Sequence, residues 1–251
     1  VHSSHEAAFT QAQFDAAFEG DAEVFTASIH EQHAFPNPKL DSDLDLGLPP
    51  GVQDATYLAH LDRVWANVQA IAGEGTDLTV LLAASYLHDL VNLPKDSPER
   101  ARASTLAAEE AAPILRALGF DEGRVTATQH AIAAHSFSAG IPPETEEARI
   151  LRDADRLDAL GAIGIARCFA VSGALDRPLY DPEDPFAAAR ALDDTRQTLD
   201  HFRTKLLNLP AGMLTARGRE IADARARRMI GFLEDLGAEI GAPLPPDWTA
   251  T

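Results

Sequence analysis

Residues 78–90 read LTVLLAASYLHDL, an apolar run that ends in the adjacent polar pair His88-Asp89. Asp77 before the run is a suitable N-cap, and the length of the run favours a helix that lies in the core. Helical spacing predicts one buried stripe formed by Leu78, Leu81 and Leu82. A core helix that ends in an imidazole and a carboxylate presents both groups at a cleft.

The rest of the chain favours an all-α domain built as a helical bundle. Alternating strand patterns are nearly absent, and helical stretches are separated by clusters of Pro, Gly and Asp. Helices are expected at Thr56–Ala72, Arg102–Leu118, Glu122–His135 and Glu144–Leu160, and close packing is expected near Ala159–Phe169. After a loop at Ser172–Asp184 come two final helices. The last begins near Thr215 and carries Met229, Phe232, Leu233 and Leu236 on one face.

The first fifty residues differ in character from the rest. We expect residues 1–50 to form a partly irregular extension, and residues 51–251 to form one domain on which the C-terminal helices pack. A helix is expected around Ala7–Phe18, followed by a short helical piece. Residues 35–51, FPNPKLDSDLDLGLPPG, contain four prolines and are predicted to be a loop.

Composition narrows the functional classes. The formal net charge of −18 disfavours nucleic acid polymers and anionic membranes as partners, but a metal and a few local cations would still admit a small phosphorylated substrate. The sequence contains no run of 18 apolar residues, so no membrane span is predicted. The first residues do not resemble a secretory signal. The single cysteine, Cys168, excludes an internal disulfide. We therefore expect a cytoplasmic protein.

Four residues are candidate ligands for one divalent cation. His60 and Asp155 would join His88 and Asp89 from other helices, giving a mixed nitrogen and oxygen site with positions left for water and substrate. Asp153 and Asp155 project about 200° apart on a helix, so only one of them can face the metal. We choose Asp155 and interpret Asp153 as an exposed charge. Asp158, on the same side of the helix as Asp155, would hold a metal-binding residue by a hydrogen bond or accept a hydrogen bond from an arginine.

Several cationic and imidazole side chains are candidates for contact with substrate. His135 opens the loop HSFSAG and could donate to a phosphate or protonate a leaving group, whereas His130 is interpreted as structural. Lys95 could reach a phosphate and assist catalysis. Further candidates for substrate binding are Arg63, His201 and Lys205, with Arg217 and Arg219 as additional phosphate contacts.

The order His…His-Asp…Asp resembles the signature of the HD-domain metal-dependent phosphohydrolases. The segments HLDRV, LAASYLHDL, HSFSAG, DADRLDALGAIGIARCF and HFRTKLLNL occur in the same order as in a bacterial branch related to nucleotide phosphohydrolases and pyrophosphohydrolases. The resemblance implies an HD-type helical bundle that hydrolyses a nucleotide or similar small phosphate ester or anhydride. The cation would be Mn²⁺, Mg²⁺, Fe²⁺, Co²⁺ or Ni²⁺. Two-metal relatives carry another histidine in the helix after His-Asp, and Arg102–Leu118 has none, so one metal is predicted.

Two other functions remain open at this point. One is a degenerate HD module that binds a nucleotide for regulation, and the other is a di-iron oxygenase with the same fold. A homodimer is also a hypothesis. The motifs of serine hydrolases, P-loop proteins and zincins are absent, and Cys168 in its apolar helix is interpreted as a packed thiol rather than a nucleophile.

Overall fold

The computed structural model describes residues 27–31, 44–48, 55–91, 93 and 99–248. The chain divides into two compact units, Val1–Leu58 and Ala59–Thr251. In the first unit, strands β1 (Ala27–Glu31) and β2 (Leu44–Leu48) form a parallel pair, with Ala27 opposite Leu44. The second strand lies within the stretch that we predicted to be an irregular loop. The helix expected around Ala7–Phe18 lies outside the described residues.

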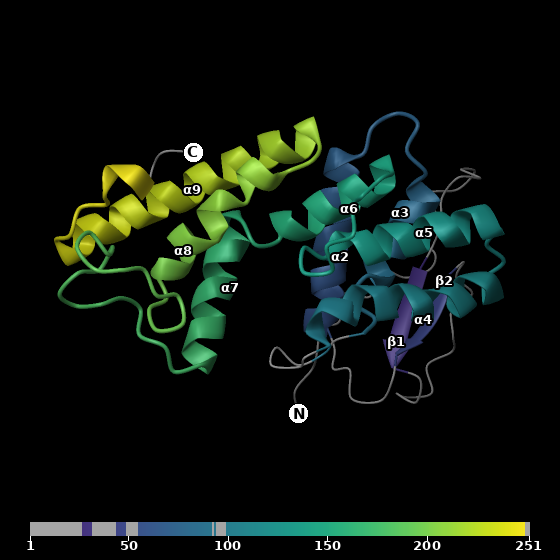
Figure 1. Ribbon diagram of the computed structural model, residues 1–251, viewed down its shortest axis with the longest axis horizontal. Helices are drawn as coiled ribbons and strands as arrows, with labels where there is room; N and C mark the ends of the chain where they lie inside the picture. The colour runs from purple at the N-terminus through teal and green to yellow at the C-terminus, as the bar shows by residue number, and fades with distance from the viewer. Residues whose placement is uncertain (1–26, 32–43, 49–54, 92, 94–98, 249–251) are drawn as a thin grey trace, which may run out of the picture. The chain divides into compact units, whose positions relative to one another are not determined.

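The second unit is helical, which confirms the all-α prediction for this part of the chain. Its α-helices are α2 (Ala55–Ile71, which begins in the first unit), α3 (Leu78–Leu87), α4 (Ala103–Ala117), α5 (Glu122–His135), α6 (Glu146–Leu157), α7 (Gly161–Ala174), α8 (Asp200–Thr204) and α9 (Ala216–Ile240). Short 3-10 helices occur at Arg100–Arg102, Leu206–Asn208, Pro210–Gly212 and Pro246–Trp248. Figure 1 shows the order of these elements along the chain.

Helix α3 lies at the centre of the packing that positions the site. It contacts α4, α5 and α6, and its residues from Val80 to Ser85 are all buried. Asp77 caps it as predicted, accepting hydrogen bonds from the backbone N–H groups of Thr79 and Val80. The predicted stripe is only partly correct, because Leu81 and Leu82 are buried but Leu78 is 52% exposed. Leu78 occupies the first helical turn, before α3 enters the core.

A sharp break separates α6 from α7. The two helix axes meet at 61°, and Gly161 adopts a φ of +72°, a conformation that favours glycine. The DADRLD segment lies just before this break, with Asp153, Ala154, Leu157 and Asp158 buried and Asp155 and Arg156 partly exposed. Helix α7 then extends to Ala174, so it includes the first residues of the loop predicted at Ser172–Asp184.

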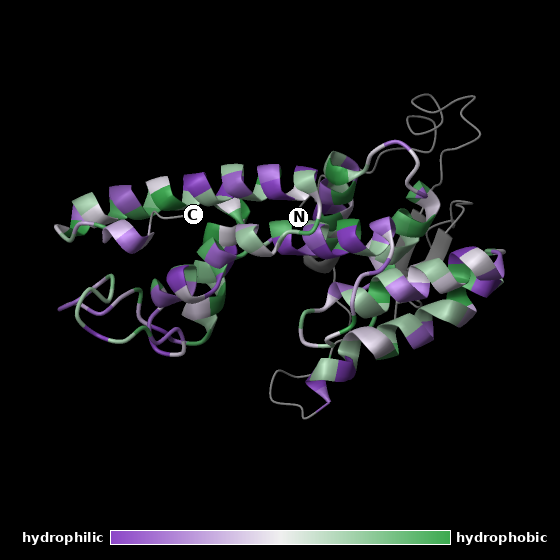
Figure 2. Ribbon diagram, turned by 45° about the horizontal axis from the view of Figure 1, so that its top comes forward, coloured by the Kyte–Doolittle hydropathy of each residue, from purple (hydrophilic) through white to green (hydrophobic). Residues whose placement is uncertain are grey.

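The long helix α9 packs against α6 and α7. Its buried positions are Ala222, Ala226, Met229, Leu233 and Gly237, the spacing of an amphipathic helix, and Figure 2 shows the matching alternation of apolar and polar residues along it. Asn67 on α2 connects three helices by donating to the carbonyl of Ala154 and accepting from Arg225. Helix α6 is thereby linked to α2 directly and to α9 through Asn67.

Among the described residues, no single helix has the length and apolar character needed to cross a membrane; only the bent pair α6 and α7 meets that test together.

Candidate metal centre

His88 supplies a buried imidazole at the C-terminal end of α3. Its Nδ1 lies 2.8 Å from the carbonyl oxygen of Ser85, and its side chain is fully buried. Because a carbonyl oxygen only accepts, Nδ1 carries the hydrogen and Nε2 is left as a lone-pair donor. Nε2 is buried and has no hydrogen-bond partner among the residues that the structure describes. Buried polar atoms are rarely left unpaired, so this nitrogen fits a metal ligand better than a structural group.

His60 comes from α2 and is oriented by a carboxylate. Its Nδ1 lies 2.9 Å from Oδ2 of Asp158, and its ring centroid lies 6.0 Å from that of His88. An imidazole that donates Nδ1–H to a carboxylate and presents Nε2 is the usual arrangement of a metal-binding histidine. The ligand atoms of His60, His88 and Asp155 all lie within 4.8 Å of one another. Asp155 lies near the C-terminal end of α6, and its side chain is 33% exposed.

Asp89 and His135 form a second group that shares His88. Oδ2 of Asp89 lies 3.6 Å from Nε2 of His88, and Oδ1 lies 3.7 Å from Nε2 of His135. His135 ends α5 and its Nδ1 lies 2.6 Å from the carbonyl oxygen of Ile132, so its Nε2 also faces the group. His88, Asp89 and His135 satisfy the same test for a metal group. His88 therefore belongs to two overlapping groups, one with His60 and Asp155 and one with Asp89 and His135. The additional imidazole of His135 comes from α5 rather than from α4.

Burial and neighbouring charges shift the pKa values of Asp89 and His135. Burial opposes ionisation of Asp89, but His88, His135, His60 and Arg100 outweigh it and hold the pKa of Asp89 below its usual range. Burial, together with the neighbouring His88, lowers the pKa of His135. A neutral His135 whose Nδ1–H is donated to Ile132 has no hydrogen on Nε2. This geometry favours a ligand or acceptor role for His135 over the predicted role as proton donor.

Asp158 holds His60 from behind. Its buried carboxylate accepts from Nδ1 of His60, from Nε of Arg63 at 2.7 Å, and from Arg167. Burial opposes its ionisation, but the hydrogen bonds from His60 and Arg63 hold the pKa of Asp158 well below its usual range. Arg63 lines a separate 290 Å³ cavity with Asp158 and is already paired. Arg63 is therefore placed to stabilise the carboxylate of Asp158, and its substrate contact stays a prediction.

Asp153 corrects one of the sequence interpretations. It is fully buried, not exposed, and its carboxylate accepts from the backbone N–H groups of Leu214 and Thr215 and from the hydroxyl of Thr215. Thr215 in turn caps α9 through the N–H of Gly218. Asp153 is therefore a structural link between α6 and the start of α9.

A cavity of about 750 Å³ opens beside the candidate ligands. Asp89, His135 and Asp155 line it, and so do Arg100, Arg156 and Lys205. Its size is suitable for a small organic phosphate. Among the described residues, three cationic side chains therefore face this cavity in a protein with a net charge of −18.

The predicted cationic residues fall into different places. Lys205 lines this cavity and an adjacent one of about 340 Å³. His201 lines only the smaller cavity, and its Nδ1 lies 2.9 Å from Asp194. Helix α8 ends at Thr204, and Lys205 is its C-cap residue, whose backbone N–H donates to the carbonyl of His201. Lys95 lies outside the described residues.

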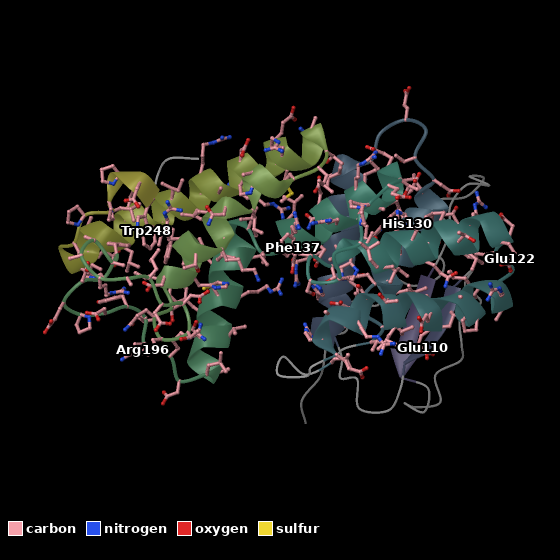
Figure 3. The ribbon with its side chains drawn as sticks, in the orientation of Figure 1. Glu110, Glu122, His130, Phe137, Arg196 and Trp248 are labelled. Carbon is pink, nitrogen blue, oxygen red and sulfur yellow. The ribbon has the colours of Figure 1, made fainter. Side chains whose placement is uncertain are left out.

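Other sequence interpretations also have an outcome in the structure. Of the two arginines predicted to contact phosphate, Arg217 donates to the carbonyl of Ala70 and to Glu220. Arg219 donates to the carbonyls of Pro210, Ala211 and Met213. His130, labelled in Figure 3, accepts from the N–H of Glu144, in line with its structural interpretation. Burial raises the pKa of Cys168 to about 11, which agrees with a packed thiol.

The sequence reasoning missed Arg100 and Arg156 as cavity residues. Arg156 directly follows the candidate ligand Asp155, and this adjacency was the signal that could have identified it. Arg100 follows a polar loop, and no spacing in the sequence distinguishes it from a surface arginine.

A helical domain that brings imidazoles and carboxylates together from separate helices, beside a cavity lined with cations, has the architecture of a metal-dependent hydrolase. The family model of the HD domain matches residues 57–160. YpgQ of Bacillus subtilis is 33% identical over 187 residues, which cover 72% of this chain and 82% of YpgQ.

Solved structures that resemble this one include the following two. YpgQ in complex with ADP has a TM-score of 0.57 at 30% identity, covering 72% of this chain and 85% of that chain. An HD-superfamily hydrolase from Bacillus thuringiensis has a TM-score of 0.58 at 31% identity, covering 79% and 90% respectively. The chain belongs to the HD-domain superfamily, whose hydrolases are metal-dependent phosphohydrolases.

Proposed function

We propose that this protein hydrolyses a nucleotide or a similar small phosphate ester or anhydride, with one divalent cation held by His60, His88, Asp89 and Asp155. The observation that carries the proposal is the unpaired, buried Nε2 of His88 beside the carboxylates of Asp89 and Asp155. The mixed nitrogen and oxygen donor set suits Mn²⁺, Mg²⁺, Fe²⁺, Co²⁺ or Ni²⁺. These residues would hold the cation where it would supply an activated water and polarise a phosphoryl oxygen.

The chain's own residues then provide positioning and charge. Asp89 offers a carboxylate oxygen to the hydrogen of the attacking water. Arg100, Arg156 and Lys205 line the same cavity and would offset the negative charge of the phosphates, the main task in phosphoryl transfer. A nucleotide is supported by the cavity volume of about 750 Å³ and by the complex of the similar protein YpgQ with ADP.

The test is a panel of metals against substrates. Purified protein is stripped of metal, reloaded with each of the five cations, and assayed on nucleoside tri-, di- and monophosphates, with phosphate and pyrophosphate measured separately. We expect release that depends on the cation and is lost on stripping. An undiminished rate in protein shown to be free of metal would overturn the proposal.

Asp89→Ala is expected to lose metal and nearly all hydrolysis while the domain stays folded. Asp89 is 47% exposed, so the loss of its carboxylate removes a ligand without opening the core. Metal content, hydrolysis rate and circular dichroism are measured together. Asp235→Ala, which removes an exposed carboxylate from α9, is the matched control and should retain both metal and activity. Full metal content in Asp89→Ala would contradict the assignment.

One observation favours a second candidate, the di-iron oxygenase. The overlapping group of His88, Asp89 and His135 would provide ligands for a second ion. Iron near two atoms per chain, with consumption of O₂ and no release of phosphate, would replace the hydrolase by this candidate.

A further inference from the structure

Phe137 is an exposed aromatic side chain at the candidate site. It follows His135 by two residues, and 79% of its surface is accessible to solvent. It lines the 750 Å³ cavity together with Asp89 and Asp155. Two residues of chain span at most about 7 Å, so the Phe137 backbone lies within one small ligand's length of the His135 backbone.

The ring of Phe137 is held by its surroundings. The guanidinium carbons of Arg152 and Arg156 each lie 5.8 Å from its centroid, a distance at which a cation is attracted to an aromatic face. Figure 3 labels Phe137. The loop itself is closed by a hydrogen bond from the N–H of Gly140 to the carbonyl of Phe137. The ring therefore has two cationic neighbours, and most of its surface remains accessible.

The cavity thus combines two kinds of contact. Arg100, Arg156 and Lys205 suit phosphate groups, and Phe137 adds an apolar planar surface. A ligand that uses both must carry phosphates and a flat ring. Stacking of a base on an aromatic side chain contributes about 1–3 kcal/mol and tolerates any base, because every base has a π face.

We propose that Phe137 is the surface on which the nucleobase of the substrate stacks, so that the cavity selects nucleotides over phosphate compounds that lack a base. The inference rests on the proposed function and deepens it by naming the residue that recognises the base. It predicts strong selection for the presence of a base and weak selection among bases.

The test compares a nucleotide with an anion that lacks the base. Phe137→Ala, Phe137→Trp and the control Leu78→Ala are assayed for the KM of ATP and for the inhibition constant of pyrophosphate. Leu78 is another exposed apolar residue and lines none of the cavities described above. We expect Phe137→Ala to raise the KM of ATP by about 5- to 150-fold, the equivalent of the stacking energy. The inhibition constant of pyrophosphate should change less than about twofold.

Phe137→Trp and Leu78→Ala should retain the wild-type KM. In Phe137→Trp, ATP should also quench the fluorescence that this variant gains over wild type. The stacking proposal would be overturned if Phe137→Ala raised the KM of ATP and the inhibition constant of pyrophosphate by the same factor. An unchanged KM for ATP in Phe137→Ala would also overturn it. If wild type hydrolyses no nucleotide, the proposed function fails instead. Calorimetric binding of ADP and pyrophosphate to the same variants then decides whether Phe137 stacks, by the same criterion.

Discussion

The imidazole rings of the candidate site are each oriented by a hydrogen bond from Nδ1. His88 and His135 each donate Nδ1–H to the carbonyl three residues earlier on their own helices, Ser85 and Ile132. His60 donates to Asp158, from a different part of the chain. In all three rings Nδ1 therefore carries the hydrogen, and the lone pair of Nε2 is left for a metal.

Asp158→Asn should weaken metal binding by about 10- to 100-fold, the usual effect of losing the partner of a metal-binding histidine. The neutral amide gives up the charge that holds His60 and Arg63. Titration calorimetry with Mn²⁺ measures the affinity, under conditions where circular dichroism shows a folded variant. Asp235→Asn on α9 is the control for loss of one acidic group. Wild-type affinity in Asp158→Asn would show that His60 needs no support from this carboxylate.

For single residues, the sequence was informative where the spacing along one helix decides which way a side chain points. The choice of Asp155, and of Asp158 as a partner, follows from angles on a single helix. Asp153 was misinterpreted because its partners, Leu214 and Thr215, lie some sixty positions later in the chain. Nothing local in the sequence indicates that a distant loop will cover a particular carboxylate.

Helices of the second unit follow their local signals closely. The predicted helix Glu122–His135 has the same bounds as α5, because Asp121 caps it by accepting from Arg124 and the loop residue Ser136 ends it. Helix α8, in contrast, has only five residues. Its segment continues as short 3-10 helices, where the hydrophobic pattern alone cannot separate one long helix from several short turns.

Asp77→Ala should lower the free energy of unfolding by about 1 kcal/mol at neutral pH, through loss of the N-cap of α3. Burial opposes ionisation of Asp77, but hydrogen bonds from Arg124, Val80 and Thr79 outweigh it and lower its pKa from 3.8. A lowered folded-state pKa stabilises above the unfolded-state value, and this stabilisation is lost as the pH falls through the folded-state value. The difference between wild type and variant should therefore shrink below pH 3.8.

Urea unfolding of metal-free protein, in steps from neutral pH to about pH 3, measures that difference. Asp235→Ala removes an exposed carboxylate that caps no helix and should show little difference at any of these pH values. A gap between wild type and Asp77→Ala that stays constant across the range would mean that the charge of Asp77 plays no part in the capping.

On the scale of the whole second unit, the candidate ligands connect helices that are distant in sequence. His60 lies on α2, His88 and Asp89 at the end of α3, and Asp155 on α6. The order of the motifs predicted that these helices contribute to one site, and the structure brings their residues together in two groups that share His88. The exposed ring of Phe137 and the cations of the cavity were less predictable, because they depend on where loops from separate helices converge.

A metal that binds only the folded state should therefore stabilise the whole unit. At a free Mn²⁺ concentration of 100 times its dissociation constant, the expected gain is about 2.7 kcal/mol. For a unit of this size that gain corresponds to a rise in Tm of roughly 5–10 °C. Calorimetric melting of metal-stripped and reloaded protein measures the change.

The net charge of −18 makes a non-specific effect of cations on stability the main alternative. Asp89→Ala separates the two explanations, because it lowers the negative charge by one and removes a ligand, whereas Asp235→Ala lowers the charge equally and leaves the ligands in place. The rise in Tm should disappear in Asp89→Ala and persist in Asp235→Ala. Equal rises in both variants would show that Mn²⁺ only screens surface charge, and the convergence of these helices would then need an explanation other than a shared ion.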